Sequence, residues 1–160
     1  MRFLQALVTN DVEALHPGDG VYAAYLTAQG RMLTDLKIHR FAEHLLVEVE
    51  AGLAAGLAER FDRLVFSEDV RVSDVSAGLA QIGVVGENSA ALLAHAFSLE
   101  PLDPETLTAL PVLGHVETAG AVMARSDDVA LPAFEVFVKG EAYEDAIQRL
   151  EEMGAVPGAT

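Results

Sequence analysis

The chain has 160 residues, of which 51% are hydrophobic and 22% charged, so it can form a packed core and is not generally disordered. Its 10 Lys and Arg residues stand against 25 Asp and Glu residues, and the formal net charge of −15 argues against nucleic acid and anionic membrane surfaces as partners. Cysteine is absent and the five histidines lack metal-ligand spacing, which excludes disulfides and thiolate catalysis and predicts no metal site.

The first half of the chain predicts an antiparallel hairpin with a helix on either side in sequence. The expected elements are a short helix over residues 2–8, strands over 21–27, 31–41 and 45–49, and a helix over 53–64. Gln29 and Gly30 form the turn that joins the first two strands. The longer helix places Leu53, Leu57 and Phe61 on one face, as an amphipathic helix requires.

The second half repeats this pattern in outline. We expect strands over 70–76 and 79–85, a helix entered at Asn88 or Ser89 and running to about 97, strands over 112–117, 121–126 and 133–138, and a last helix over 141–153. Pro101, Pro104 and Pro111 predict an irregular connection. Three strands followed by a helix thus occur about twice. This order favours an α+β fold of antiparallel sheets with helices packed on one face, in two ββ(β)α-type halves, over a parallel doubly wound sheet.

The sequence also predicts the surroundings in which the protein works. It contains no uninterrupted apolar run of the roughly 18 residues that a membrane-spanning helix needs. Its first residues do not combine a charged region, a long apolar region and a small-residue cleavage site, as a secretory signal peptide does. We therefore expect a cytoplasmic protein of one domain, or of one domain and a part of another.

Asp35 is the first candidate for chemistry. Side chains alternate along the strand over 31–41, so Met32, Thr34, Leu36 and Ile38 are expected on the core face, and Arg31, Leu33, Asp35, Lys37 and His39 on the open face. A carboxylate between cations stays ionised and can position an amine or accept its proton. The same spacing also fits a solvated strand face with alternating charges.

Glu135 is the second candidate. It shares one strand face with Phe137, and a carboxylate beside a flat ring suits a pterin, whose amino group and ring N–H are parallel donors. Arg125 lies on the preceding strand and is expected to return near Glu135, where it could bind a carboxylate. Tyr22 and Tyr25 project to opposite faces of their strand, so at most one faces the same pocket as Asp35; we take Tyr25 as the ligand-binding tyrosine. The alternatives are an exposed Glu and a surface Arg.

Four segments carry a family resemblance, and they occur in order along nearly the whole chain: 3–12 (FLQALVTNDV), 25–36 (YLTAQGRMLTDL), 74–76 with 82–90 (DVS and IGVVGENSA), and Arg125 with 134–136 (FEV). Together they resemble the amino-terminal half of the folate-binding aminomethyltransferase family. That family includes the glycine-cleavage T-protein and the YgfZ-type iron–sulfur maintenance proteins. The first two segments are the specific ones, and Gln29-Gly30-Arg31 is similar to the YgfZ-like branch.

The resemblance implies the T-protein/YgfZ folate-binding fold and tetrahydrofolate as the cofactor. It implies that Asp35 approaches N10 of the folate as the catalytic residue, and that Glu135, with Arg125 and Tyr25, binds the cofactor. Implied partners are the small-molecule folate and either iron–sulfur client proteins or a lipoyl carrier protein. We expect residues 1–160 to form a partial folate-binding domain, about half of a family member, without the carboxy-terminal barrel domain.

Three functions remain open on the sequence. The first is a YgfZ-like protein with a tetrahydrofolate-dependent role in iron–sulfur protein assembly or repair, or in one-carbon metabolism. The second is a glycine-cleavage aminomethyltransferase, in which a folate amine attacks an aminomethyl group on a lipoyl arm and ammonia leaves. The third is a non-catalytic interaction module that has lost the ligand. Two departures from the family favour the third: Ser126-Asp127-Asp128 replaces the usual glycine-rich segment, and Glu50 replaces the usual asparagine before Ala51.

Overall fold

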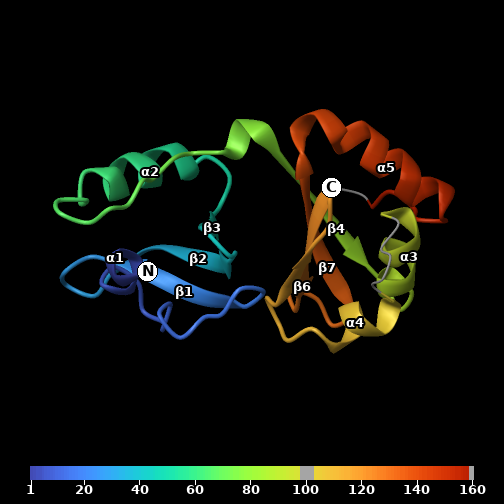
Figure 1. Ribbon diagram of the computed structural model, residues 1–160, viewed down its shortest axis with the longest axis horizontal. Coiled ribbons are helices and arrows are strands. Elements are labelled where there is room, and N and C mark those ends of the chain that lie inside the picture. The colour runs from blue at the N-terminus through green and yellow to red at the C-terminus, as the bar shows by residue number, and fades with distance from the viewer. Residues whose placement is uncertain (98–102, 159–160) are drawn as a thin grey trace. The chain divides into compact units, whose positions relative to one another are not determined.

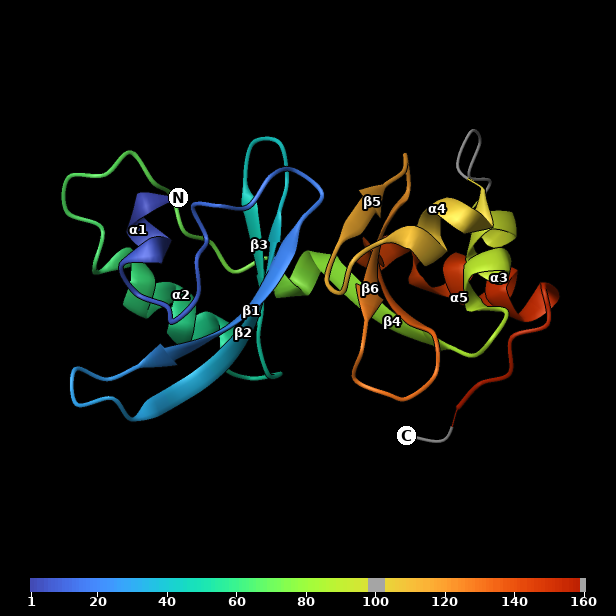
Figure 2. The same cartoon turned by 90° about the horizontal axis from the view of Figure 1, so that it is seen from below.

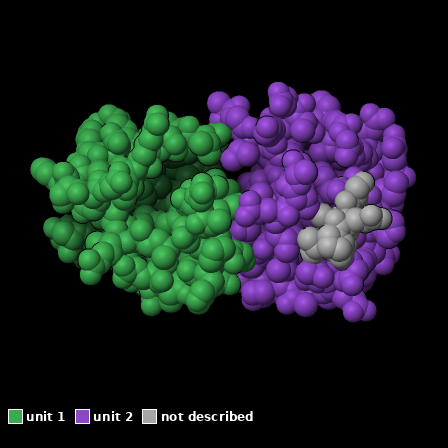
Figure 3. Space-filling model, in the orientation of Figure 1, with its two compact units in different colours: residues 1–76 green, residues 77–160 purple. Residues whose placement is uncertain are grey.

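The computed structural model describes residues 1–97 and 103–158, which leaves Pro101 of the predicted irregular connection outside the described residues. The chain divides into two compact units, Met1–Ser76 and Ala77–Thr160, here called the first and the second unit (Figure 3). Each unit contains an antiparallel sheet with helices, so the predicted α+β class is confirmed. In the described ranges, no helix is both long enough and apolar enough to cross a bilayer.

The first unit is built on a three-stranded antiparallel sheet in the order β1-β2-β3. Its strands are β1 (Gly20–Leu26), β2 (Met32–Arg40) and β3 (Leu45–Glu48). The turn between β1 and β2 requires Gly30, whose φ of 80° is a left-handed conformation that side chains disfavour. The predicted hairpin is therefore confirmed.

Helices α1 (Arg2–Gln5) and α2 (Ala54–Asp62) cover one face of this sheet, as Figure 2 shows. Apolar side chains from alternate positions of β1 and β2 meet them in a core made of Leu4, Val12, Ala23, Tyr25, Leu36, Ile38 and Phe61. Burial of this apolar surface is the main force that holds the unit together. The opposite face of β2 is left without a helix from this unit.

The second unit contains a four-stranded antiparallel sheet in the order β4-β7-β6-β5. Its strands are β4 (Leu79–Val85), β5 (His115–Glu117), β6 (Ala121–Ser126) and β7 (Ala133–Lys139). β7 pairs with both β4 and β6 and is thus a central strand, whereas β4 is at the edge.

Helices α3 (Ser89–Ala96), α4 (Pro104–Ala109) and α5 (Tyr143–Glu152) pack on one face of the four-stranded sheet (Figure 1). Short 3₁₀ helices, Ser76–Gly78 and Gly140–Ala142, precede β4 and α5. The buried core is formed by Ile82, Val84, Leu93, Ala96, Leu107, Ala121, Met123, Phe134, Val136, Val138, Ala146 and Leu150.

Two sequence predictions about elements are wrong. Residues 70–76 form no strand in the structure; Val70 and Val75 are exposed, and no neighbouring strand pairs with this segment. Part of the proline-marked connection is the helix α4 rather than irregular chain. Pro104 occupies the first helical turn, where a missing N–H costs nothing, and the Asp103 side chain accepts a hydrogen bond from the Thr106 N–H.

Candidate functional site

Asp35 lies in the middle of β2, on the face that the helices of the first unit leave uncovered. Its neighbours Thr34 and Leu36 are buried while Asp35 itself is exposed, so the predicted alternation is confirmed at this position. The alternation is wrong at the two ends of the strand. Met32 is 65% exposed beside the turn, and His39 is buried although it shares a face with Asp35.

The hydroxyl of Tyr22 holds the Asp35 carboxylate. Tyr22 Oη donates to Asp35 Oδ2 over 2.7 Å. The register pairs Ala24 with Asp35 and Tyr22 with Lys37, so Tyr22 reaches Asp35 diagonally across the two strands. This bond, followed by a hydrogen bond from the Asp35 backbone and the nearby Lys37 ammonium, lowers the pKa of Asp35 below its usual value of 3.8.

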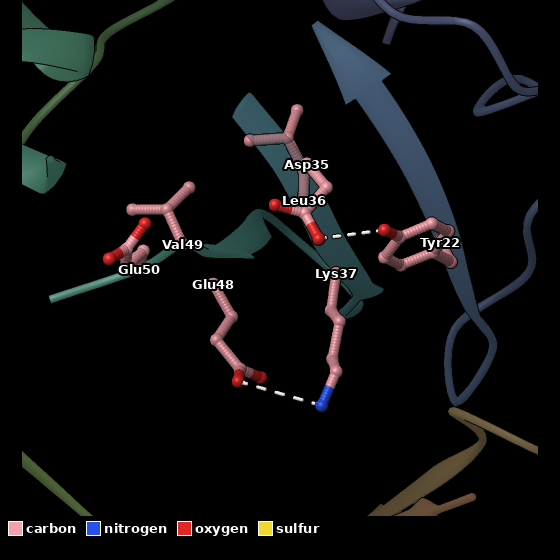
Figure 4. Close-up of a pocket in the computed structure, with 7 residues that line it drawn as sticks. All are labelled: Tyr22, Asp35, Leu36, Lys37, Glu48, Val49 and Glu50. Atoms are coloured by element: carbon pink, nitrogen blue, oxygen red, sulfur yellow. Dashed lines mark hydrogen bonds and ion pairs between the residues drawn. The ribbon is translucent and has the colours of Figure 1, made fainter. Parts of the chain in front are cut away.

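A hollow of about 330 Å³ opens beside this pair (Figure 4). It is lined by Tyr22, Asp35, Leu36, Lys37, Glu48, Val49 and Glu50. Lys37 Nζ lies 3.8 Å from Glu48 Oε1, and the buried His39 lies 3.8 Å from the other oxygen of the same carboxylate. The volume of the hollow is at the lower end of the roughly 300–1,000 Å³ that is typical of small-molecule sites.

The charges around this hollow favour a ligand rich in hydrogen-bond donors. Its lining includes the carboxylates of Asp35, Glu48 and Glu50 and the single ammonium of Lys37. An ionised carboxylate accepts hydrogen bonds and does not donate them, so the site suits an amine or an amino-substituted ring. It repels a free carboxylate by the same reasoning.

The Tyr22→Phe substitution is expected to raise the pKa of Asp35 toward 3.8, because it removes the largest cause of the lowered value. The pKa of Asp35 is lower in the folded chain than in the unfolded chain. Ionised Asp35 therefore favours folding above pH 3.8, and this contribution is lost as pH falls through the folded-state pKa. Titration of the Asp35 carboxyl carbon by NMR measures the change, with Tyr143→Phe as the control. An unchanged pKa of Asp35 in the Tyr22→Phe chain would show that the Tyr22 hydroxyl is not the main cause of the lowered value.

Tyr25, which the sequence analysis takes as the ligand-binding tyrosine, does not line this hollow; Tyr22 does. Its ring is 6% exposed and lies in the core of the first unit, in edge-to-face contact with Phe61 at a centroid separation of 5.1 Å. Its hydroxyl accepts a hydrogen bond from Arg60 Nε over 3.0 Å. Tyr22 is the tyrosine that faces Asp35, and Tyr25 has a packing role on the other face of β1.

Glu135 lies in the second unit, on β7, where it is half-buried. Its carboxylate accepts a hydrogen bond from Gln81 Nε2 of β4 over 2.5 Å. The residue of β4 that lies directly opposite Glu135 is Gly83, at which an added Cβ would meet no atom within 4 Å. Phe137 shares the face of Glu135, as the alternation predicts, and is buried. On β4, Glu135 is therefore flanked by the Gln81 amide and by a glycine that carries no side chain.

β6 returns beside β7, as expected, and brings Arg125 next to Glu135 in the register, but the Arg125 side chain does not share the face of Glu135. The register pairs Ala124 with Glu135 and Arg125 with Phe134, so Arg125 and Glu135 project to opposite faces of the sheet. The Arg125 guanidinium donates from Nη1 to the carbonyl oxygens of Thr108 and Leu110, over 3.1 Å and 2.5 Å. These carbonyls lie at the end of α4, where a cation is favourable to the helix dipole.

Sequence reasoning did not select Tyr22, Glu48 or Gln81 for the site. Glu48 is brought beside Lys37 by the pairing of β3 with β2, and Gln81 is brought beside Glu135 by the pairing of β4 with β7. No local pattern identifies such partners, because the register between strands decides them. The face that Tyr22 shares with Asp35 depends on a shift in the β1–β2 register between Tyr25 and Leu26, which the sequence does not reveal.

Comparison with known proteins gives a consistent result. The family model described as the GCVT N-terminal domain matches residues 1–160. An aminomethyltransferase of Rubrobacter xylanophilus is 31% identical over 160 residues, which cover 98% of this chain and 41% of that protein. A mitochondrial iron–sulfur cluster assembly factor IBA57 homolog of Mycosarcoma maydis is 29% identical over 119 residues, covering 65% of this chain and 30% of that protein.

A solved structure shares the fold. The crystal structure of glycine cleavage system aminomethyltransferase T from Bartonella henselae superposes with a TM-score of 0.75 at 22% identity, over 93% of this chain and 39% of that chain. The present chain therefore spans less than half the length of the relatives that it matches.

Proposed function

This chain belongs to the GCVT N-terminal domain family, and on that basis we propose that it binds a tetrahydrofolate at the hollow beside Asp35. The observation that supports this proposal best is the Tyr22–Asp35 hydrogen bond on the sheet face that the helices of the first unit leave free. It fixes the position of a carboxylate acceptor beside a space of about 330 Å³. An ionised carboxylate in this position can orient a folate amine and accept its proton.

The charge of the site determines which end of the cofactor it takes. Folate has a donor-rich pterin with its neighbouring amines at one end and carboxylates at the other. Asp35, Glu48 and Glu50 around the hollow would repel those carboxylates, and the net charge of −15 acts in the same direction. The amine-bearing end is therefore the part that binds, and the carboxylate tail stays in solvent.

Glu135, in the second unit, is proposed as a further residue that binds the cofactor, and this part of the proposal rests on the family resemblance. Its carboxylate is half-buried and already accepts one hydrogen bond from Gln81, so it is held in place before a ligand arrives. Gly83 leaves the neighbouring position free of side-chain atoms, which gives a flat ring room to approach. Arg125 is not included, because its guanidinium caps α4.

Two uses of the folate remain, and each has an observation in its favour. Gln29-Gly30-Arg31 and the similarity to an iron–sulfur cluster assembly factor favour a role in assembly or repair of iron–sulfur proteins, with those client proteins as partners. The match of 98% of the chain to an aminomethyltransferase favours group transfer from a lipoyl carrier protein. We propose the first as the main function, in the cytoplasm, and the second as the alternative.

Titration with 5-formyltetrahydrofolate tests the binding proposal. Calorimetry is expected to show saturable binding at high micromolar ligand or below, and the melting temperature is expected to rise as ligand is added. p-Aminobenzoylglutamate, which carries the tail without the pterin, is the control and is expected to have no effect. No binding of 5-formyltetrahydrofolate would reject both folate functions and leave the interaction module.

A second assay separates the two uses. The chain is supplied with an aminomethylated lipoyl carrier protein and tetrahydrofolate, and the release of ammonia is measured. The main proposal predicts folate binding with no ammonia release above the uncatalysed rate. Release that depends on both chain and folate would instead establish the aminomethyl transfer.

A further inference from the structure

The segment Thr9–Asn10 runs along the outer edge of β1 and occupies hydrogen-bonding groups that an edge strand would otherwise leave to solvent. The Thr9 N–H donates to the Ala24 carbonyl over 3.1 Å, and the Ala24 N–H donates to Thr9 Oγ1 over 2.9 Å. Asn10 Nδ2 donates to the Tyr22 carbonyl over 3.0 Å. Both residues lie in the first of the two specific sequence segments, and the proposed function assigns neither a role.

These bonds reach the two β1 residues that matter for Asp35. Tyr22 carries the hydroxyl that donates to Asp35, and Ala24 is the direct cross-strand partner of Asp35. We propose that Thr9 and Asn10 form a clip that positions Tyr22, and through Tyr22 the Asp35 carboxylate, for the ligand of this site. The ligand assignment rests on the proposed function, whereas the positioning does not.

The clip is itself held on its far side, so it can transmit a fixed position to β1. Asn10 Oδ1 accepts from the Asp11 N–H over 2.8 Å. Gln5 Oε1 of α1 accepts from the Val12 N–H over 2.6 Å, and the Val12 side chain is fully buried in the core. The Asn10 side chain thus donates to β1, and Val12, two residues further along the chain, is anchored to α1 and to the core.

Geometry explains why such a clip is needed. The hydrogen bond from Tyr22 to Asp35 is a diagonal one, and β1 pairs with another strand of its sheet on one side only; its outer edge carries the isolated bridge between Val8 and Tyr25 and the bonds from Thr9 and Asn10. Edge strands open more readily than central ones, and a hydrogen bond weakens steeply when its donor moves out of line. Fixing the Tyr22 backbone limits the positions that its ring can take.

The test uses substitutions that remove the side-chain hydrogen bonds of the clip. Asn10→Ala removes the donor to Tyr22, and Thr9→Val replaces the hydroxyl by a methyl group of similar shape. Both are expected to raise the pKa of Asp35 toward 3.8, as measured by NMR titration of its carboxyl carbon. Asn10→Asp, which keeps the oxygen that accepts from the Asp11 N–H, removes only the donor to Tyr22 and is expected to act like Asn10→Ala. Thr9→Ser keeps the hydroxyl and is expected to restore the lowered pKa. Asn88→Ala is the control, because its side chain makes no capping bond at α3.

The role of Tyr22 as the intermediate is tested in a double variant. If the clip acts through Tyr22, Asn10→Ala adds no further change to the pKa of Asp35 in a Tyr22→Phe background. Lys37, Glu48 and Glu50 also face this site and are unchanged in every variant, so their influence cancels. A folded Asn10→Ala variant, or a Thr9→Val variant, with the wild-type pKa would overturn the clip.

The same variants separate this inference from the proposed function. If the Asp35 pKa is raised in Asn10→Ala and Thr9→Val and the wild-type chain does not bind 5-formyltetrahydrofolate, the folate proposal is rejected and the clip is kept. A wild-type pKa in chains that bind the folate would reject the clip and keep the folate proposal.

Discussion

The Asp35→Asn variant is expected to bind 5-formyltetrahydrofolate within about three-fold of the wild-type affinity, because an amide oxygen still accepts a hydrogen bond from an amine. Any folate-dependent aminomethyl transfer is expected to fall by at least about 100-fold, since an amide cannot take the proton of the attacking amine. In the wild-type chain the Tyr22 hydroxyl holds the Asp35 carboxylate in a fixed position, where it can accept that proton.

Calorimetry and the ammonia-release assay measure the two effects separately. Asp127→Asn is the matched control, because Asp127 is an exposed aspartate in the loop between β6 and β7. It is expected to change neither quantity. This comparison applies where the wild-type chain releases ammonia, as the alternative function predicts; release at the same rate by Asp35→Asn would then show that Asp35 has no catalytic role, whatever its effect on binding.

The Glu135→Gln variant is expected to weaken 5-formyltetrahydrofolate binding by about 10-fold to 100-fold. Hydrogen bonds to a charged group contribute about 1.5–3 kcal/mol each, and a neutral amide loses the paired acceptors that a pterin amino group and ring N–H require. The substitution keeps the shape of the side chain, so folding is expected to change little. Calorimetric titration measures the affinity, and a melting curve checks the fold.

Two further variants make this prediction specific. Glu141→Gln removes a carboxylate that is exposed beside α5 and is expected to leave the affinity unchanged. Gly83→Val places a side chain directly across from Glu135, in space where a Cβ meets no atom within 4 Å. It is expected to preserve folding and to weaken binding by crowding the ring. Wild-type affinity in both Glu135→Gln and Gly83→Val would remove Glu135 from the proposed site.

Elements with strong local signals could be predicted from the sequence. The β1–β2 hairpin follows from Gln29-Gly30 between two apolar-alternating segments, and the helix α2 follows from its apolar spacing. The predicted strand over 70–76 has the right composition but no strand to pair with, and pairing is a non-local property. The sequence does not predict the helix α4, because three prolines in a short stretch indicate an irregular connection, although proline is favourable in the first turn of a helix.

A single irregularity in the β1–β2 register decides which tyrosine faces Asp35. Leu26 pairs with Met32, and an unbroken register from this pair would place Tyr25 opposite Leu33, on the face of Asp35. The strands instead shift between Tyr25 and Leu26, so Tyr25 pairs with Thr34, and the extra residue on β2 reverses which side chains share a face. Tyr22 therefore faces Asp35, and Tyr25 faces the core.

The position of Asp35 was predictable, whereas its surroundings were not. Period-two alternation between Thr34 and Leu36 suffices to expose its side chain. The carboxylates of Glu48 and Glu50 reach the same hollow through the pairing of β3, and Arg125 turns away from Glu135 through the register of β6 on β7. Both outcomes depend on which residues of two strands lie opposite each other, and composition does not determine this.

The most direct test follows the backbone amides of the ¹⁵N-labelled chain by NMR while 5-formyltetrahydrofolate is added. The account predicts saturable shifts at Tyr22, at Asp35 to Lys37 and at Glu48 to Glu50, the residues around the hollow in the first unit. Saturable binding that leaves these amides unmoved, or no binding at all, would contradict it.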